Sequence, residues 1–494
     1  MKKISILLFL LLTVFTSFGQ IKFEYVYSTS GFDKAEGIVQ TYDSGYAVIG
    51  STEGFIGLSD IYLMKTDKNG FLQWSKTYGG TQIDQGYDIV ETKDSGFAII
   101  GFTNSYGAGY DIIFIKTDEN GDTIFTKIIG EIGWDFGYAL KQTADGGYIL
   151  AGETYKSGFS KGYAIKLDSL GNTTWKKTFG GAKNDKFEDV IITNSGSFVF
   201  VGETKSYGNG RQAYIVKTNN AGSLSWQKAL GNAGIDFAKS VVELSNTDLV
   251  FTGGTNTPPY QDIDNWVVKV NSLGVTQQMQ TVLDYSSTPT TTQNDEWNEC
   301  VEIYRTDSMF FGGFRTYDPW EKGNVYSYLY TSDIATGYLG DFQKFIYSFK
   351  ESIQDIKSTK DKGVIFACTA EQLGTGGSSI YLIKMDKSLT LPPPFPNSIL
   401  YQTDISSVDE IEKITEMKFF PNPVKNTGTF WFANLNGEPS KIVLRNISGK
   451  IIETKKLNDS KLQVDFSSFA NGIYFATVIQ NNKKMKTIKI VVSK

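Results

Sequence analysis

The 494-residue chain contains no histidine. Serine and cysteine hydrolases that depend on a histidine base are therefore excluded, and so is any metal site built on imidazole nitrogen. The chemistry that stays open is a pair of carboxylates, a lysine or tyrosine base, or a metal bound by oxygen atoms alone. Acidic and aromatic side chains are consequently the candidates for a functional site.

Cysteine is nearly as scarce, with Cys300 and Cys368 as the only two. A secreted chain of this length with two cysteines does not rely on a disulfide framework. Two isolated cysteines are more often small buried side chains than a bridge, although pairing between them stays open from the sequence.

Long apolar runs are limited to the first residues, MKKISILLFLLLTVFTSFGQ. Lys2 and Lys3 precede an apolar segment at 4–15, and the small residue Gly19 follows it. This order is typical of a secretory signal peptide, which we place at residues 1–19. No second run is long enough to span a bilayer, so we expect no transmembrane segment in the mature chain.

The formal net charge of −5 is unevenly distributed. Residues 416–494 contain 13 Lys and Arg against 5 Asp and Glu, a net charge of +8. Because Lys2 and Lys3 of the signal peptide contribute a further +2, residues 20–415 have a net charge of −15. This asymmetry predicts a domain boundary near residue 415. The acidic body is a poor partner for nucleic acid or for an anionic membrane.

Glycine and aromatic residues are abundant, and they occur in a repeated pattern. "DSGYAVIGST" at 43–52 returns as "DSGFAIIGFT" at 94–103 and as "ADGGYILAGET" at 144–154. The glycine that ends the apolar run recurs every 50 or 51 residues, and a Lys-x-Asp/Asn-x-x-Gly marker recurs in step with it. The first marker falls at Gly50, Gly101, Gly152, Gly202 and Gly253, and the second ends at Gly70, Gly121, Gly171, Gly222 and Gly274.

Each repeat of about 51 residues predicts four strands joined by tight turns, for example at 87–92, 97–103, 111–117 and 123–128. Two weaker copies follow the five regular ones, which gives about seven. The fold class that this pattern favours is all-β, a propeller of about seven four-stranded blades, with an open β-solenoid as the alternative. The segment at 22–28 resembles a fourth strand, so we expect it to complete the last blade and close the ring.

The predicted turns orient the ring. The turns between the first and second strands, and between the third and fourth, are short and lie on one face. The second-to-third loops and the links between blades are longer and more varied, and they lie on the other face. We expect function on this second face, because binding residues concentrate on loops that a rigid scaffold positions.

The repeat pattern ends at a proline-rich and acidic stretch, and a different sequence pattern follows it. We interpret this stretch as a linker at 391–415, between a propeller at 20–390 and a C-terminal domain at 416–494. Runs at 417–424, 441–452, 465–479 and 486–494 are separated by Pro-Asn, Ser-Gly and Asn-Gly turns. They predict a small Ig-like β-sandwich.

This C-terminal domain resembles the type A sorting domain of proteins exported by the Bacteroidetes type IX secretion system. The resemblance implies contact with the type IX machinery, passage across the outer membrane, and a secreted or cell-surface location; an ordinary Ig-like appendage is the alternative. The repeats more loosely resemble Gly/Tyr-rich propeller repeats of secreted proteins with such a tail. The residues that carry the sorting-domain resemblance are Pro421, Asn422, Pro423, Gly449, Lys450, Asn471, Gly472, Ile473 and Tyr474.

Acidic residues recur at two kinds of position. The hairpins at 67–71 and 118–122 faintly resemble calcium loops, but they lack the further oxygen ligands that a full loop needs, and hairpin turns favour Asp and Asn. Acids at the start of each blade most often cap backbone N–H groups, although a ring of them could bind a cation. We expect no cofactor and assign no metal ligand, with calcium left open. The recurring acids are Asp84, Asp135, Asp185, Asp236 and Asp295.

The repeat breaks down between 256 and 324, where long loops bring aromatic residues beside charged ones. Such combinations suit glycan or peptide contact, although loop aromatics also pack locally. The regularly spaced Trp74, Trp175 and Trp226 are instead expected as core between blades. The candidate ligand-binding residues are Tyr260, Trp297, Arg315, Tyr317, Trp320 and Glu321.

Together these features favour a secreted, cell-surface, non-catalytic binding or adhesion protein with a glycan or protein ligand on the varied face. A hydrolase or lyase that acts on polysaccharide through carboxylates or a tyrosine is one alternative, and a purely structural surface protein is another. No residue is assigned a catalytic role, because no acid pair stands out.

Overall fold

The computed structural model describes most of the chain, in a series of segments. These are residues 21–29, 31–53, 58–107, 109–156, 158–256, 263–282, 296–305, 308–316, 325–333, 339–345, 351–371, 377–389, 400–402, 417–432, 440–446, 450–457, 461–480 and 483–494.

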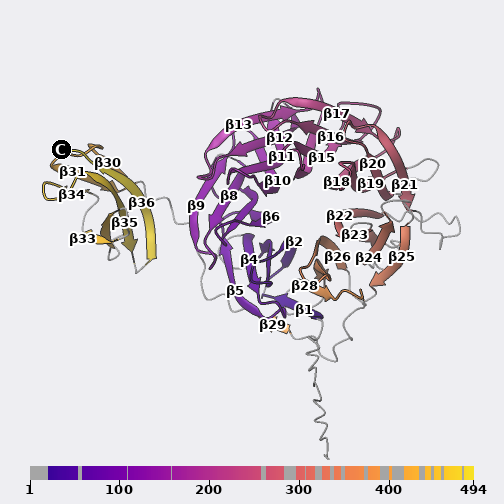
Figure 1. Cartoon of the computed structure of the whole chain (residues 1–494), viewed down its shortest axis with the longest axis horizontal. Helices are drawn as coiled ribbons and strands as arrows, with labels where there is room; N and C mark the ends of the chain where they lie inside the picture. The colour runs from indigo at the N-terminus through magenta and orange to yellow at the C-terminus, as the bar shows by residue number, and fades with distance from the viewer. Residues whose placement is uncertain are drawn as a thin grey trace, which may run out of the picture. The chain divides into compact units, whose positions relative to one another are not determined.

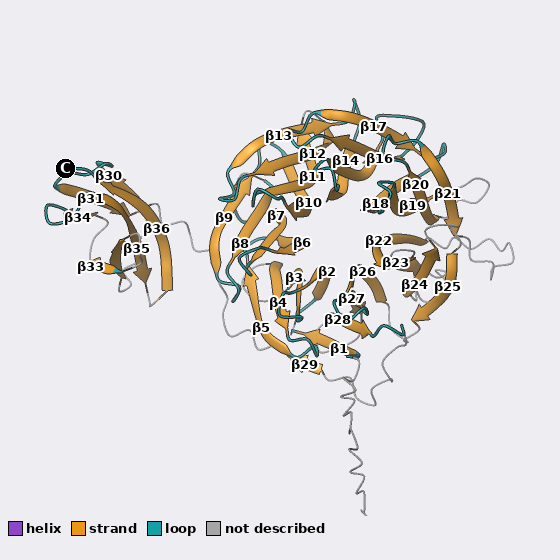
Figure 2. Cartoon of the chain, in the orientation of Figure 1, coloured by secondary structure: helices purple, strands orange, loops and turns teal. Residues whose placement is uncertain are grey.

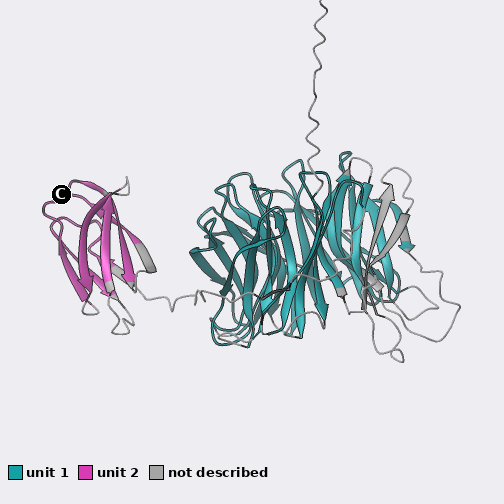
Figure 3. Ribbon diagram, turned by 90° about the horizontal axis from the view of Figure 1, so that it is seen from below, with its two compact units in different colours: residues 1–408 teal, residues 409–494 magenta. Residues whose placement is uncertain are grey.

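Every regular element in these residues is a β-strand (Figure 2). The all-β fold class is therefore confirmed. The chain divides into two compact units, Met1–Val408 and Asp409–Lys494 (Figure 3). Within the described segments there is no helix with the length and apolar character needed to cross a membrane.

The first unit is a ring of seven sheets, the blades of a propeller (Figure 1). In each of blades 1 to 6, four antiparallel strands follow one another in sequence order, with the first strand innermost. Blade 1 is β2 (Asp33–Gln40), β3 (Tyr46–Thr52), β4 (Asp60–Thr66) and β5 (Leu72–Tyr78); blade 2 is β6 (Asp84–Glu91), β7 (Phe97–Thr103), β8 (Asp111–Thr117) and β9 (Thr123–Ile129); blade 3 is β10 (Trp134–Gln142), β11 (Tyr148–Lys156), β12 (Phe159–Leu167) and β13 (Thr173–Phe179); blade 4 is β14 (Asp185–Ile192), β15 (Phe198–Thr204), β16 (Gln212–Thr218) and β17 (Leu224–Leu230); blade 5 is β18 (Asp236–Glu243), β19 (Leu249–Thr255), β20 (Asp264–Val270) and β21 (Thr276–Val282); blade 6 is β22 (Glu296–Arg305), β23 (Ser308–Thr316), β24 (Val325–Asp333) and β25 (Leu339–Phe345).

Blade 7 closes the ring with both ends of the propeller sequence. Its sheet runs β26 (Glu351–Ser358), β27 (Val364–Glu371), β28 (Ser378–Met385) and then β1 (Phe23–Ser28). β1 pairs antiparallel with β28, from Phe23 opposite Lys384 to Tyr27 opposite Ile380. The predicted closure by the N-terminal segment is confirmed.

A fifth strand, β29 (Leu400–Gln402), extends this sheet, parallel to β1. It comes from the segment that the sequence predicts as linker. Its three residues show no alternation of apolar and polar side chains, so no sequence pattern signals the strand.

The repeated "D-x-G" turn is a small hydrogen-bonded assembly, seen clearly at Asp145. Asp145 accepts hydrogen bonds from the Thr143 hydroxyl and from the N–H of Gly147 at 3.0 Å. The buried ammonium of Lys166, on the third strand, donates to the same carboxylate at 3.1 Å and to the Leu167 carbonyl at 3.0 Å. Lys65 with Asp43, Lys116 with Asp94 and Lys384 with Asp361 repeat the arrangement at 2.9, 3.0 and 2.9 Å.

This assembly predicts acid sensitivity. The Thr143 hydroxyl, the N–H of Gly147 and the Lys166 ammonium lower the pKa of Asp145 to about 2, against the opposing effect of burial. Because the folded-state pKa lies below the unfolded value of about 3.9, the contribution to stability is present above pH 4 and is lost as the pH falls toward 2. A carboxyl NMR titration should place the midpoint near 2. Asp145→Ser, which copies Ser195 of blade 4, should lessen the loss of stability on acidification; an unchanged profile would contradict the assignment.

The glycine of the Lys-x-Asp/Asn-x-x-Gly marker lies where neighbouring blades pack against each other. Gly121 has a φ of +76°, a conformation that favours glycine, and a side chain there would meet the ring of Trp74 from the preceding blade at 2.8 Å. Gly222 and Gly274 receive Trp175 and Trp226 in the same way, at 3.1 and 2.9 Å. The prediction that these tryptophans pack between blades is confirmed.

Cys300 and Cys368 are both buried in the hydrophobic cluster shared by blades 6 and 7, and no disulfide joins them. Burial is the largest of several effects that raise the pKa of Cys300 well above its usual value. Both residues therefore serve as small core side chains.

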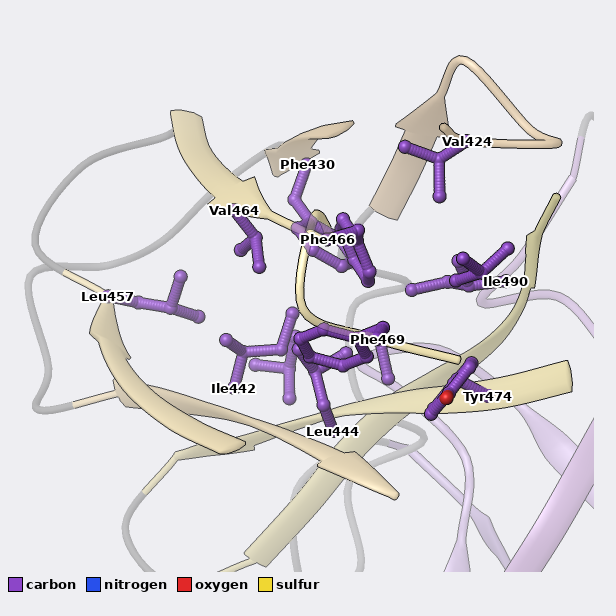
Figure 4. Packing of buried hydrophobic residues seen from close by; sticks show 13 residues of the cluster. Val424, Phe430, Ile442, Leu444, Leu457, Val464, Phe466, Phe469, Tyr474 and Ile490 are labelled. Carbon is purple, nitrogen blue, oxygen red and sulfur yellow. The ribbon is translucent and has the colours of Figure 1, made fainter. Parts of the chain in front are cut away.

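The second unit is a β-sandwich of two sheets, as predicted. Its core gathers 13 buried residues, among them Phe430, Phe466 and Tyr474 (Figure 4). One sheet is β30 (Met417–Phe420), β31 (Thr427–Phe432) and β34 (Lys461–Asp465); the other runs β33 (Ile451–Leu457), β32 (Ser440–Asn446), β35 (Gly472–Gln480) and β36 (Lys483–Val492).

Candidate functional site

In the second unit, two of the predicted sorting residues hold the last strand. The Asn422 side chain accepts from the N–H of Val491 at 2.8 Å and donates to the Lys489 carbonyl at 3.0 Å. The Asn471 side chain accepts from the N–H of Lys494 at 2.9 Å. The Pro-Asn-Pro and Asn-Gly turns therefore fix the C-terminal end of the chain to the body of the sandwich. Gly449 lies outside the described residues.

In the propeller, the aspartates that begin the blades serve as backbone caps. Asp185 Oδ2 accepts from the N–H of Gly181 at 2.9 Å and from the Ser206 hydroxyl at 2.6 Å. Asp84, Asp135 and Asp236 accept the equivalent backbone N–H at 2.8, 2.9 and 2.8 Å. This is the capping role that the sequence favours. Asp295 lies outside the described residues.

The hairpin acids are also engaged by backbone. Asp67 Oδ1 accepts from the N–H groups of Asn69 at 2.8 Å and Phe71 at 2.9 Å. Asn219 and Asn271 take the same place in blades 4 and 5, where Oδ1 of each accepts two N–H groups. A neutral amide performs the same task there, so this turn position does not depend on a negative charge.

The innermost strand of every blade contains a β-bulge at the same position. In each, one residue is left out of the ladder, for example Tyr87 between Gly86 and Asp88. The extra residues form one ring of side chains at the inner wall of the propeller. They are Glu36, Tyr87, Tyr138, Glu188, Lys239, Glu299 and Gln354.

This ring is charged on one side and aromatic on the other. The Lys239 ammonium lies 3.6 Å from Glu188 and 3.5 Å from Glu299. Burial lowers the pKa of Lys239, but the two carboxylates outweigh it and raise the pKa above its usual value. Across blades 2 and 3 the ring consists of Tyr87 and Tyr138, whose rings meet edge to face at 5.2 Å.

The two tyrosines begin a continuous cluster of aromatic rings in blades 2 and 3. Tyr138 stacks on Phe136 at 6.3 Å, and Phe136 lies 5.1 Å from Phe102 and 5.5 Å from Tyr110. We call the following seven residues the aromatic cluster: Tyr87, Phe102, Tyr110, Trp134, Phe136, Tyr138 and Tyr155.

The outer end of the aromatic cluster reaches solvent on the face of the long loops. Trp134 lies 6.0 Å from Tyr110 and 5.8 Å from Tyr155 and is 53% exposed, and the preceding Ile132 is 95% exposed. The N–H of Asp135 donates to the Tyr110 carbonyl at 2.7 Å, which ties the two loops together. An exposed apolar group of this size on a rigid support is typical of a contact surface.

The inner tyrosines are not poised for base catalysis. Burial, followed by the charges of Glu153 and Glu188, raises the pKa of Tyr138 far above its usual value. Its hydroxyl donates to Glu153 at 2.9 Å, and the Lys186 ammonium lies 5.7 Å from its ring. The arrangement orders the rings.

The structure does not test the ligand residues that the sequence predicts. Tyr260, Tyr317, Trp320 and Glu321 lie outside the described residues. Trp297 lies in β22, where its backbone pairs with that of Phe314 in β23. Arg315 lies in β23, opposite Glu296 in β22. The side chains of Trp297 and Arg315 are not among the described parts of the structure.

The aromatic cluster went unrecognised in the sequence because its members are dispersed over 87–155 within regular repeats. A signal did exist. "EIGWDFGY" at 131–138 places three aromatic residues on alternate positions of a strand, whereas the equivalent positions of the other regular repeats carry at most one aromatic residue each. Alternate positions of a strand share one face.

Comparison with known proteins assigns the second unit. Residues 418–493 match the family model for the secretion system C-terminal sorting domain. No curated protein matches the chain.

Some solved structures are similar to this chain at low identity. PorZ, an essential bacterial surface component of the type IX secretion system of Porphyromonas gingivalis, is 12% identical, with a TM-score of 0.40 over 91% of this chain and 58% of that one. The extracellular domain of a protein described as a hybrid two component system of B. thetaiotaomicron is 12% identical, with a TM-score of 0.43 over 94% of this chain and 57% of that one. The β-propeller domain of the Trilobed protease of Pyrococcus furiosus is 10% identical, with a TM-score of 0.43 over 75% of this chain and 100% of that one.

The chain spans 58% of the length of PorZ and 57% of the length of the B. thetaiotaomicron protein. Its C-terminal unit is a type IX secretion sorting domain, and the protein is therefore exported to the cell surface or secreted.

Proposed function

We propose that the propeller is a non-catalytic binding module of the cell surface, and that its ligand, a glycan or a protein, contacts the face of the long loops. The observation that carries this proposal is the half-exposed ring of Trp134. The neighbouring rings of Tyr110 and Tyr155 hold it in place. A ligand that covers it therefore costs little conformational entropy.

The chemistry around Trp134 suits such a ligand. The flat ring and the exposed Ile132 offer apolar surface, and the ion pair of Glu131 with Lys156, at 2.9 Å, supplies polar groups beside it. An aromatic ring flanked by polar groups is the usual composition of glycan sites and of interface hot spots. The loops of blades 5 and 6, with Tyr260, Trp297, Arg315, Tyr317, Trp320 and Glu321, remain our proposed second contact region.

The experiment is a screen of the purified protein against a glycan array and against surface proteins of its own cell, followed by Trp134→Ala with the ligand found. We expect the affinity to fall at least about tenfold, since a buried tryptophan at an interface is commonly a hot spot. The exposed ring contributes little to the fold, so Tm should change little.

Tyr42→Ala is the matched control. Tyr42 is another exposed aromatic residue, at 60%, but it lies in the β2–β3 turn on the opposite face. Its replacement should leave the affinity unchanged. Equal affinities for the Trp134 variant and the wild-type protein would reject this face of blades 2 and 3 as the site.

A further inference from the structure

The fourth strands of blades 1 to 4 carry a lysine at the same register position, where the outer edge of one blade meets the next. These lysines are Lys76, Lys127, Lys177 and Lys228. The first of them has a carboxylate partner across the junction. Lys76 forms an ion pair with Asp122, which follows the marker glycine in the β8–β9 hairpin of blade 2. The positive charge at the junction of blades 1 and 2 is therefore neutralised.

The junction of blades 2 and 3 is different at two positions. Asn172 follows the marker glycine there, where blade 2 has Asp122, and its Oδ1 accepts from the Lys127 ammonium at 3.2 Å. Lys176 stands on β13 at the register position that Thr126 holds on β9. The junction thus exchanges a carboxylate for a neutral amide and gains a second ammonium group.

Both lysines line one pocket at this junction. The pocket has a volume of about 280 Å³, and Asn172 and Thr173 contribute to the same wall lining as Lys127 and Lys176. A methyl group added to Gly171 would lie 3.1 Å from both Cγ and Cε of Lys127, so the aliphatic part of this lysine lies against the hairpin of blade 3. Two cationic side chains, one amide and one hydroxyl group from two blades therefore share one space.

Within the described residues, no carboxylate forms an ion pair with either lysine. The carboxylate of Glu131, which follows the lining residue Gly130, is paired with Lys156 at 2.9 Å. The hydrogen bond and the charge of Lys156 are the main causes that lower the pKa of Glu131, and the charge of Lys176 comes after them. Two like charges in one pocket repel each other, and an anion bound between them relieves that repulsion.

We propose that this pocket binds one carboxylate or sulfate group, carried by a ligand about the size of a single sugar. Lysine ammonium groups bind such anions through charge-assisted hydrogen bonds. The Asn172 amide and the Thr173 hydroxyl are suited to the neutral hydroxyl groups of a sugar. The volume lies at the lower end of the range for ligand pockets, about 300–1,000 Å³, which suits one small group.

Two further facts separate this site from other interactions of the protein. Residues 20–415 have a net charge of −15, so the body offers anions no general attraction, and binding has to be local. The pocket is formed at β9 and β13, the outermost strands of blades 2 and 3, and does not include Trp134 (Figure 1). Its ligand is therefore independent of the function proposed for the loop face.

The test titrates the whole mature protein with sodium glucuronate, sodium sulfate or glucose, at an ionic strength held constant with NaCl. We expect calorimetry to show one glucuronate per chain, and Tm to rise with its concentration because the ligand stabilises the folded state. Glucose, which lacks the carboxylate, should do neither. Sulfate distinguishes the sources of the anion: equal affinity means that the pocket binds the anionic group alone, and weaker binding means that the sugar ring contributes.

Three variants locate the site. Lys127→Met and Lys176→Met should each lower the affinity for glucuronate at least about tenfold, since each removes a charge-assisted hydrogen bond. Asn172→Asp copies Asp122 of blade 2, so its carboxylate should pair with Lys127 and abolish binding of both anions. Because these side chains lie at the outer edge of the ring, the Tm of the ligand-free protein should change little in all three.

Lys177→Met is the matched control. It makes the same change of charge at the equivalent position of the next junction and should leave the affinity unchanged. The proposal is wrong if neither glucuronate nor sulfate binds the wild-type protein. It is also wrong if Lys177→Met weakens binding as much as Lys127→Met does, or if Asn172→Asp binds glucuronate with the wild-type affinity.

Discussion

We expect that a mature protein that lacks residues 21–28 will not fold into a stable propeller. The deletion removes β1, and with it Phe23, Val26 and Tyr27, each 1% exposed in the cores of blades 7 and 1. Loss of a large buried side chain costs about 2–5 kcal/mol, so three of them rival the 5–15 kcal/mol that stabilises a typical domain. The deletion also uncovers β28, which is buried over seven of its eight residues, as an edge open to aggregation.

Tyr27→Ala is the milder form of this change. Its hydroxyl donates to the Gly70 carbonyl at 2.5 Å, which links blade 7 to blade 1. We expect the free energy of unfolding in urea to fall by about 3–5 kcal/mol. As a control, replacement of Leu400–Gln402 by Gly-Ser-Gly removes β29 but leaves blade 7 with four strands, and the loss should be smaller. A protein without β1 that melts at the wild-type Tm would show that closure does not stabilise the ring.

Asp361→Ala should lower the free energy of unfolding by roughly 2–4 kcal/mol, because it leaves a buried ammonium without its carboxylate. The Lys384 side chain is 0% exposed and donates to both Asp361 oxygens, at 3.1 and 2.9 Å, and to the Met385 carbonyl at 2.7 Å. Asp361 itself reaches solvent, which places the effect below that of a fully buried pair.

The double variant Asp361→Ala with Lys384→Met separates charge from turn geometry. Methionine is an apolar side chain of similar length to lysine, so the double variant should recover most of the lost free energy of unfolding. With both charges removed, no buried charge is left without a partner. Equal destabilisation of the single and double variants would mean that the turn, and not the buried charge, carries the effect. Glu131→Ala is the control, because its ion pair with Lys156 is exposed and should contribute little to the free energy of unfolding.

The blade strands could be predicted because their signals are local. Turn residues and apolar runs predict 97–103 and 111–117 for β7 and β8, and the structure gives Phe97–Thr103 and Asp111–Thr117. Ring closure could also be predicted, because the N-terminal segment repeats the pattern of a fourth strand. The strand β29 could not be predicted, since its pairing depends on the free edge of β1 and not on its own residues.

The candidate sites depended on contacts between repeats. The sequence places the aspartates at blade starts as caps, and this role is confirmed for Asp84, Asp135, Asp185 and Asp236. It does not show that Lys127 and Lys176 line one pocket, because one side chain comes from each of two blades. The same reason hides the aromatic cluster, whose rings come from β6, β7, β10, β11 and a loop.

By itself, the sequence determined the repeat, the all-β propeller, its closure and the export domain, because each rests on residues close together in the chain or on a pattern copied from blade to blade. Only the tertiary structure decided which side chains the bulges turn toward the inner wall and which lysine side chains share a pocket between blades. Those outcomes depend on the twist and register of neighbouring sheets, which bring together residues half a repeat or more apart.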